Sequence, residues 1–420
     1  MTEPAALRGY LPPGFQDLFL EEAARRRQAE EHLRDLFSRW AYAEVIPPTL
    51  EYAETLAVGT GAGLHQSAYR FLDREGHTLA LRTDFTPQVA RLAAGRLAGR
   101  PLPLRCFYLG SVFRHEEPQA GRQREFTQAG VELLGACTPA ADAEVIALAI
   151  NVLETLPVPD FQLCLGQAGL FRALTAGLGP AEVDRIRDAV DRRNPDDLSL
   201  AMEVAAVDEP QRTLLAQLPE RIGGPKVLAP FLTLGGAAAA AAESLVRVYH
   251  ALQRHGVADR VLLDLGEVRG MEYYTGVTFR GLAPGLGRPV LSGGRYDRLV
   301  GQFGRPLSAV GFGLGLERAL LVQAGPAPDL APALIVQGCE HAECAHLVRR
   351  LRAPGRRVEV DVLARTGEEL WAYAQQAGCR LVLRCAGDGG PWFLRGVDGE
   401  RTVQARELQE TIASIMEELL

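Results

Sequence analysis

Apolar and polar positions alternate along two neighbouring stretches, 104–115 and 124–134, which predicts two paired antiparallel strands. One face of the second strand would carry Thr127, Ala129, Val131 and Leu133, and the other would carry Phe126, Gln128, Gly130 and Glu132. The first set is small and apolar enough to pack on a core. The second favours a pocket wall, because Gly130 would leave room for a ligand. The alternative is a half-exposed hairpin with a solvated polar face.

Upstream of this strand pair, apolar residues at helical spacing predict a helix over 21–40, followed by a short strand at 43–46 and a hairpin over 69–81. Asp84 and Thr86 then stand where a strand gives way to a helix over 88–97. Their oxygen atoms would either cap that helix or hold a substrate ammonium group. Arg114 ends the first of the two paired strands, where it would meet an anionic group.

The middle of the chain predicts a helix over 138–155, a strand over 161–165 and a helical region at about 167–256. Breaks are expected at Gly179–Pro180 and at Asn194–Pro195, because proline cannot continue a helix. This helical region carries no recognisable chemistry.

Residues 261–316 form a second polar cluster on predicted strands. Tyr273 and Tyr274 are adjacent, so we expect one on each side of the sheet. Arg295, Tyr296 and Asp297 follow a double glycine, and Arg318 follows a glycine-punctuated strand. Arginine–carboxylate pairs in such turns are often structural, but three strand-plus-arginine units together favour a site.

A proline-rich linker at 326–332 leads to a small unit over 333–420 in which strands and helices alternate, which predicts a parallel sheet. Four residues there have side chains typical of metal ligands: Cys339, His341, Cys344 and His346. They straddle a strand end and a helix start, where two of the four would point away, so we expect no metal.

Composition narrows the class of protein. The 420 residues are 47% hydrophobic and 23% charged, with a net charge of -7, which indicates a globular chain without the basic footprint of a nucleic-acid binder. Several of the seven scattered cysteines lie in apolar, strand-like runs, which is typical of buried thiols in a reducing compartment. No N-terminal stretch resembles a signal peptide. We therefore expect a cytoplasmic protein that does not enter membranes.

Several motifs make a resemblance specific, and they occur in the order expected of one family. Motif 2 of class II aminoacyl-tRNA synthetases resembles the stretch FRHEEPQAGRQREF, and motif 3 resembles GFGLGLER. The two histidine signatures of histidyl-tRNA synthetase resemble RGMEYYTG and SGGRYD. EVIPPTLEY resembles motif 1, a dimer-forming element. The resemblance implies an α+β fold: an antiparallel sheet flanked by helices over 1–325, then a small C-terminal α/β domain similar to an anticodon-binding domain.

A paralogous family, the regulatory subunits of ATP phosphoribosyltransferase, resembles the chain more closely in its motifs. The similar stretches are LRTDFTPQVAR, REFTQAGVELLG and LDLGEVRG. The chain departs from the synthetases at Asp84, Thr127 and Ser292, where they usually have glutamate, histidine and glycine. The resemblance implies a homodimer core that assembles with the short-form catalytic subunit, activates it and mediates histidine feedback at the first step of histidine biosynthesis. It implies no catalytic residue and no cofactor of the chain's own.

The resemblance also assigns residues. A pocket for free histidine would use Asp84 and Thr86 at the α-amino group, Gln128 and Glu132 at other polar ends, Arg269 at the carboxylate, and Tyr273 and Tyr274 around the imidazole. Arg114 and Arg318 match the arginines that hold ATP phosphates in the synthetases, and here would be a phosphate-binding remnant.

Two other activities stay open. The first is histidyl-tRNA synthetase, a ligase using ATP, Mg²⁺ and tRNA. Residues 331–420 contain 11 arginines against 13 acidic residues, which makes tRNA a poor partner for this unit. The second is a scaffold that has kept the fold and lost ligand binding.

Overall fold

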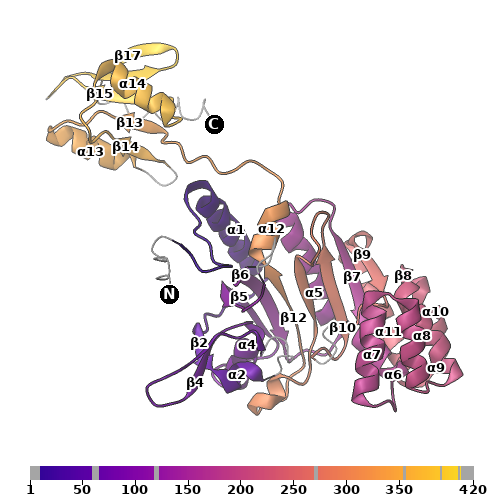
Figure 1. Cartoon of the computed structure of the whole chain (residues 1–420). Coiled ribbons are helices and arrows are strands. Elements are labelled where there is room, and N and C mark those ends of the chain that lie inside the picture. The colour runs from indigo at the N-terminus through magenta and orange to yellow at the C-terminus, as the bar shows by residue number, and fades with distance from the viewer. Residues whose placement is uncertain are drawn as a thin grey trace, which may run out of the picture. The chain divides into compact units, whose positions relative to one another are not determined.

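The computed structural model describes residues 10–58, 66–117, 123–268, 273–352, 356–387, 390–404 and 407. The chain divides into two compact units, Met1–Pro326 and Ala327–Leu420 (Figure 1). Each unit has its own sheet and its own hydrophobic core.

The first unit is built on a nine-stranded sheet in the described part of the chain. In spatial order its strands are β1 (Ala43–Glu44), β5 (Leu104–Phe113), β6 (Glu125–Leu134), β12 (Ala309–Gly315), β11 (Leu291–Arg295), β10 (Val277–Leu282), β7 (Gln162–Gln167), β9 (Val261–Asp264) and β8 (Ile222–Gly223). Within the six strands from β5 to β7 every neighbouring pair is antiparallel, whereas β1 pairs with β5 and β9 pairs with β7 in parallel. The expected antiparallel sheet and its central β5–β6 pair are confirmed.

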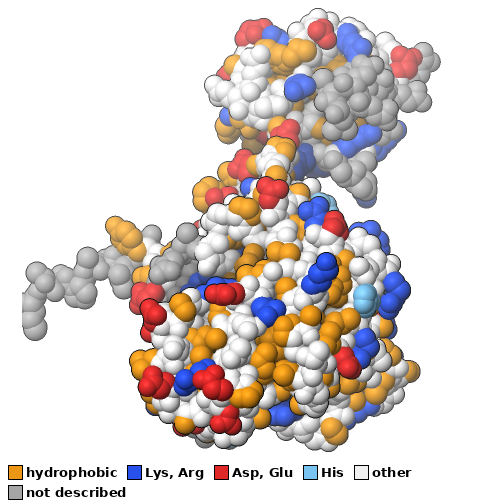
Figure 2. All heavy atoms as spheres, turned by 90° about the vertical axis from the view of Figure 1, so that its right-hand side faces the viewer, with side chains coloured by type: hydrophobic (Ala, Val, Ile, Leu, Met, Phe, Trp, Pro, Cys, Tyr) orange, Lys and Arg blue, Asp and Glu red, His pale blue; other side chains and the backbone are white. Residues whose placement is uncertain are grey.

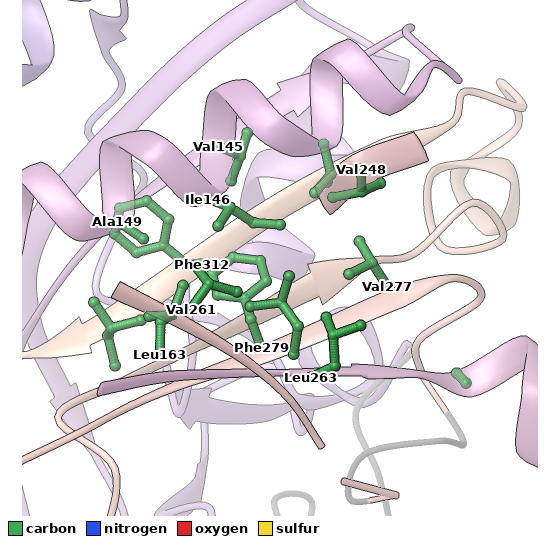
Figure 3. Packing of buried hydrophobic residues seen from close by; sticks show 14 of the residues in the cluster. Val145, Ile146, Ala149, Leu163, Val248, Val261, Leu263, Val277, Phe279 and Phe312 are labelled. Atoms are coloured by element: carbon green, nitrogen blue, oxygen red, sulfur yellow. The ribbon is translucent and has the colours of Figure 1, made fainter. Parts of the chain in front are cut away.

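Helices cover one face of this sheet and form the larger core with it. They include α1 (Leu20–Arg39), α5 (Pro139–Thr155), α11 (Gly236–Arg254) and α12 (Leu316–Val322). Figure 3 shows Val145 and Ile146 of α5 directed at the side chains of Leu163, Phe279 and Phe312 on three strands. Helix α5 consists mostly of apolar residues, and buried side chains occur in almost every turn of it. This is typical of a helix that is enclosed on several sides.

The opposite face of the sheet carries a smaller core and the polar residues of interest. Helix α4 (Thr86–Ala94) and the 3₁₀ turn η4 (Val300–Phe303) pack there, with Val89 and Val300 fully buried. A separate three-stranded sheet, β2 (Leu50–Tyr52), β4 (Thr78–Leu81) and β3 (Arg70–Leu72), lies with α2 (Ala53–Ala57) in the same part of the chain.

Between β7 and β9 the chain forms a helical segment. Its elements are α6 (Ala168–Leu174), α7 (Pro180–Arg192), α8 (Pro195–Val204), α9 (Glu209–Gln217), η1 (Leu218–Glu220), η2 (Pro225–Leu228), α10 (Ala229–Leu232), α11 and η3 (Ala258–Arg260). The predicted breaks are confirmed, because Pro180 and Pro195 each open a helix, where the missing N–H costs nothing. On the face of the first unit shown in Figure 2, acidic and basic side chains are interspersed with apolar ones, and several charged side chains of opposite sign lie next to one another.

The second unit contains a five-stranded sheet in the order β14 (Val358–Val360), β13 (Leu334–Val336), β15 (Val382–Cys385), β16 (Trp392–Gly396) and β17 (Gly399–Val403). Helices α13 (Ala342–Leu351) and α14 (Gly367–Gln376) connect the first three strands. These three are parallel, as predicted. The antiparallel hairpin β16–β17 was not predicted, because its charged residues mask the alternation of strand positions.

Two expectations on local structure are wrong. Tyr273 and Tyr274 precede β10 instead of lying within it, so the argument that they face opposite sides of the sheet fails. Cys339 and Cys344 are joined in a disulfide, so these two are not thiols as expected. No helix in the described ranges has both the length and the apolarity needed to cross a bilayer.

Candidate functional site

Strand β6 is buried on both of its faces, which excludes the half-exposed hairpin. Ala129 and Val131 point into the larger core. Gln128 and Glu132, on the other face, are only 7% and 1% exposed. A buried carboxylate in a sheet is costly unless it is well hydrogen-bonded, so the surroundings of Glu132 decide what this face can do.

Three hydroxyl groups from separate segments converge on the Glu132 carboxylate. Thr86 Oγ1 donates to Oε1 at 2.8 Å, Tyr108 Oη donates to the same oxygen at 3.4 Å, and Tyr296 Oη donates to Oε2 at 2.5 Å. Burial raises the pKa of Glu132 to about 8, while the hydrogen bonds from Tyr296 and Thr86 act in the opposite direction. Glu132 therefore changes its charge near physiological pH, and a cation next to it would favour the ionised form.

Asp84 is connected to Glu132 through Thr86, which hydrogen-bonds to both carboxylates. Its Oδ1 accepts a hydrogen bond from the Thr86 backbone N–H at 2.9 Å, which is the helix-start role that the sequence left open. Its Oδ2 faces Gln128 Nε2 at 3.2 Å and Arg114 Nη2 at 3.5 Å. The hydroxyl of Thr86 does not cap the helix but donates to Glu132. The Asp84 carboxylate therefore contacts both the start of α4 and the polar side chains near Glu132.

The room that Gly130 creates is not left for a ligand, contrary to the prediction. A Cβ at position 130 would lie 2.5 Å from the Tyr108 hydroxyl and would also clash with the Phe312 carbonyl oxygen. The Tyr108 ring fills that space and stacks on Phe85, with the ring centroids 4.5 Å apart. The absence of a side chain at Gly130 therefore makes room for Tyr108, whose hydroxyl donates to Glu132.

Three tyrosines form an aromatic wall beside Glu132. The ring of Tyr273 stacks on that of Tyr296 with centroids 5.0 Å apart, and Tyr274 meets Tyr273 edge-on at 5.1 Å. The Tyr273 hydroxyl is buried and has no hydrogen-bond partner among the described residues. Burial raises the pKa of Tyr273 well above its ordinary value, so this hydroxyl keeps its proton as a donor. Arg269, the predicted carboxylate ligand, lies outside the described residues.

Arg114 and Arg318 line one pocket of about 90 Å³, together with Arg288 and the ring of Phe126. The Arg114 and Arg318 guanidinium carbons lie 5.1 Å and 6.0 Å from the centre of that ring. Burial, with repulsion from Arg114 and Arg288, lowers the pKa of Arg318 to about 10, so it stays charged at neutral pH. Glu116 and Glu317 also line this pocket, so its three arginines leave a net positive charge, which fits an anion with several oxygen atoms.

Arg295 and Asp297 have a structural role. Arg295 is 6% exposed and donates to Asp142 Oδ1 at 2.6 Å and to Asp297 Oδ1 at 3.0 Å. Asp297 Oδ2 also accepts from Thr275 Oγ1 at 2.8 Å. This network fixes the turn that aims Tyr296 at Glu132. Sequence reasoning did not assign Tyr296 or Tyr108 to the site; Tyr296 was named within the SGGRYD motif but was given no role.

Comparisons with known proteins identify the family of the chain. A family model described as histidyl-tRNA synthetase matches residues 14–319. The fold and the site therefore define a chain of the histidyl-tRNA synthetase family. Histidyl-tRNA synthetase from Nostoc sp. PCC 7120 has the same fold, with a TM-score of 0.78 at 20% identity over 97% of this chain and 99% of that one.

Relatives at higher identity place the chain more narrowly. Two proteins called ATP phosphoribosyltransferase regulatory subunit, from Moorella thermoacetica and Symbiobacterium thermophilum, are each 42% identical, over 88% and 91% of this chain and 97% and 98% of their own. A Bacillus halodurans structure called ATP phosphoribosyltransferase regulatory subunit/histidyl-tRNA synthetase has a TM-score of 0.80 at 31% identity, covering 90% of this chain and 99% of that one. The chain belongs to the family of ATP phosphoribosyltransferase regulatory subunits.

Proposed function

We propose that the chain binds free histidine at Glu132 and passes this signal to a short-form ATP phosphoribosyltransferase catalytic subunit, which it also activates. The proposal joins the family membership to the polar cluster described above. It assigns the chain a place at the first step of histidine biosynthesis, in the cytoplasm, where ATP and phosphoribosyl pyrophosphate are available to the catalytic partner.

The observation that carries the proposal is that one site contains both the buried, titratable carboxylate of Glu132 and the buried Tyr273 hydroxyl, which has no hydrogen-bond partner among the described residues. Glu132 would accept a cationic group of histidine, and the buried Tyr273 hydroxyl would donate to a ligand acceptor. Tyr274 and Tyr273 supply the flat apolar surface that an imidazole ring prefers. The Arg269 side chain, next to these tyrosines in the sequence, is assigned to the histidine carboxylate.

Coupling to a partner requires histidine to bind two states of the complex with different affinity. The Glu132 site meets this condition in principle, because its hydrogen bonds come from three chain segments whose positions a ligand would change together.

The test is calorimetry of the full chain with L-histidine, followed by activity of the short catalytic subunit alone, with the chain, and with the chain plus histidine. We expect binding, activation on mixing and inhibition by histidine. Glu132→Gln should abolish histidine binding while activation on mixing remains. Glu31→Gln, at an exposed position of α1, is the matched control and should behave as the unchanged chain. Binding without any effect on the partner would refute the regulatory role.

A homodimer core is part of the proposal. Ile46 is 84% exposed, and Leu50 and Tyr52 on edge strand β2 are 41% and 54% exposed. Apolar side chains beside an unpaired strand edge are typical of an interface. These residues belong to the stretch that resembles the dimer-forming motif of the synthetases.

The second candidate is a histidine–tRNA ligase, favoured by one observation: Arg114 and Arg318 still share a pocket next to the Glu132 cluster. Histidine-dependent exchange of pyrophosphate into ATP, followed by tRNA charging, distinguishes the two functions. Robust exchange and charging by the purified chain would replace the regulatory proposal.

A further inference from the structure

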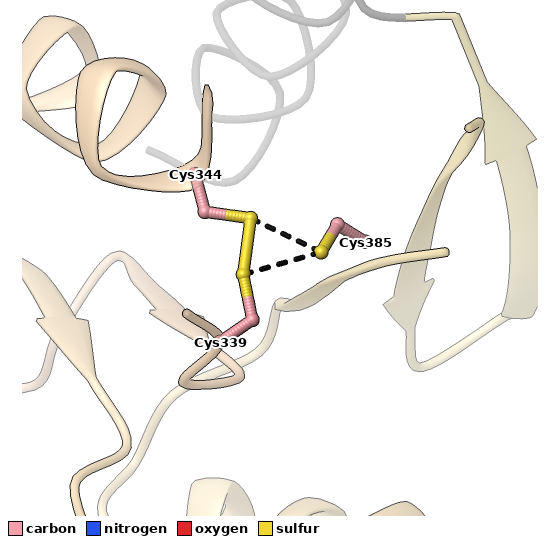
Figure 4. The surroundings of a disulfide bond; sticks show 3 residues. All are labelled: Cys339, Cys344 and Cys385. Atoms are coloured by element: carbon pink, nitrogen blue, oxygen red, sulfur yellow. Dashed lines mark hydrogen bonds between the residues drawn. A yellow bond between two sulfur atoms is a disulfide. The ribbon is translucent and has the colours of Figure 1, made fainter. Parts of the chain in front are cut away.

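In the second unit three cysteines and a histidine lie close together, and one of them, Cys385, was not among the candidate ligands predicted from the sequence. The sulfur atoms of Cys339, Cys344 and Cys385 and a ring nitrogen of His341 all lie within 4.8 Å of one another. Cys385 Sγ is 3.0 Å from Cys344 Sγ and 3.3 Å from Cys339 Sγ (Figure 4). His346, which sequence reasoning included, is exposed on α13 and outside the cluster, and Cys385 takes its place.

The topology explains this convergence. Strands β13 and β15 are parallel neighbours, with Val336 paired to Leu383, so their carboxyl ends meet at one edge of the sheet. Cys339 and His341 follow β13, whereas Cys385 is the last residue of β15. The expectation that two of the ligands would point away fails, because it considered only the strand–helix segment and not the neighbouring strand.

From this geometry we infer that Cys339, His341, Cys344 and Cys385 form a zinc site. Three sulfurs and an imidazole are a known ligand set of structural, four-coordinate zinc, and Cys339 and Cys344 have a spacing of the C-x₄-C kind. With Zn–S bonds of about 2.3 Å, tetrahedral geometry separates sulfurs by roughly 3.8 Å, so small outward movements would admit the ion.

The surroundings favour a bound cation held by thiolates. Cys344 lies in the first turn of α13, where the helix dipole stabilises negative charge. Arg349 and Arg352 line a pocket of about 460 Å³ together with Cys339 and Cys344. Their positive charge would offset the net single negative charge of Zn²⁺ with three thiolates. Cys339 is exposed, which gives the ion a route to the site.

The disulfide between Cys339 and Cys344 and the zinc site are alternative states of the same sulfurs. A disulfide sulfur carries no thiolate charge, so the ion requires reduction. With a phosphine reductant, the S–S bond is cleaved, the phosphine and one water become the phosphine oxide, and two thiols form. Zinc then binds with release of the thiol protons.

The test uses the full chain, reduced with a phosphine and freed of metal, then titrated with Zn²⁺ and separately with Co²⁺. We expect one ion per chain, thiolate-to-cobalt charge-transfer absorption with the strong visible bands of a tetrahedral ion, and a higher unfolding temperature that a chelator reverses. Cys385→Ser should weaken zinc binding by at least about tenfold and His341→Ala should alter the visible cobalt spectrum.

Cys137→Ser is the matched control, because Cys137 is exposed and belongs to the first unit. It should bind zinc like the unchanged chain. His341→Ala tests the site without replacing a cysteine, so a folding defect in Cys385→Ser would not decide the outcome. A reduced, folded chain that binds no Zn²⁺, or a Cys385→Ser variant that binds it undiminished, would overturn the zinc site.

Discussion

The Tyr296 hydroxyl donates a hydrogen bond to Glu132 Oε2 at 2.5 Å, across the intervening strand β12. The two residues are 164 positions apart in the sequence. This bond opposes the effect of burial on the pKa of Glu132, because it stabilises the ionised carboxylate.

Tyr296→Phe should therefore raise the pKa of Glu132 further. We expect the pH at which histidine binding is half-maximal to move upward, and the free energy of unfolding to fall by about 1–3 kcal/mol. Calorimetry across pH and urea unfolding measure the two effects. Tyr249→Phe, on half-buried Tyr249 of α11, serves as control. An unchanged pH profile in Tyr296→Phe would contradict this assignment.

Stability should depend on pH through Glu132. Burial raises its pKa from 4.5 to about 8, so the folded chain retains a proton that the unfolded chain loses between these values. The contribution of Glu132 to the free energy of unfolding then decreases as pH rises from about 4.5 to 8, by at most about 1.4 kcal/mol per pH unit. Urea unfolding of the unchanged chain and Glu132→Gln at several pH values measures this slope, which the variant should lack. Equal slopes would rule out the raised pKa.

Histidine binding should release protons near pH 7. If a cationic group of the ligand lies against Glu132, the carboxylate must ionise on binding, and affinity should rise with pH towards about 8. Calorimetry in two buffers with different ionisation enthalpies gives the number of protons released. An equal heat in both buffers would show that Glu132 is not the group that meets the cation.

Gly130→Ala should destabilise the first unit, because the added Cβ would press on the Tyr108 hydroxyl and the Phe312 carbonyl oxygen. Overpacking of this kind costs about 1–3 kcal/mol. Gly99→Ala is the control, since a Cβ there meets no atom within 4 Å. Thermal unfolding of the two variants should differ clearly, and equal midpoints would mean that the strand pair has more room than the contacts indicate.

Arg318→Gln should weaken binding of pyrophosphate at least about tenfold, because it removes a charged hydrogen-bond donor from the pocket shared with Arg114 and Arg288. Arg39→Gln is the control, since Arg39 is largely exposed and forms its ion pair with Asp35, one helical turn away. Histidine binding should be unaffected in both variants. Pyrophosphate binding that survives Arg318→Gln would remove this pocket from consideration as a phosphate site.

Much of the fold follows from local pattern. The alternation in 124–134 predicts β6, and prolines place the starts of α7 and α8, because both signals depend on neighbouring residues alone. The site is less predictable. Asp84, Thr86, Gln128 and Glu132 were named and do meet. Tyr108 looked like an ordinary strand residue, and only the pairing of β5 with β6 shows that it occupies the space above Gly130. Cys385 is distant in sequence from Cys344, so only the parallel pairing of β13 and β15 reveals their proximity.

The convergence of hydroxyls on Glu132 has a mechanical consequence. Thr86 belongs to α4, Tyr108 to β5 and Tyr296 to the turn after β11, so one carboxylate ties together segments that are otherwise far apart along the chain. On the proposed function, a cationic ligand that competes for this carboxylate would weaken all three hydrogen bonds at once. A change at Glu132 would therefore reach a helix, a strand and a turn together.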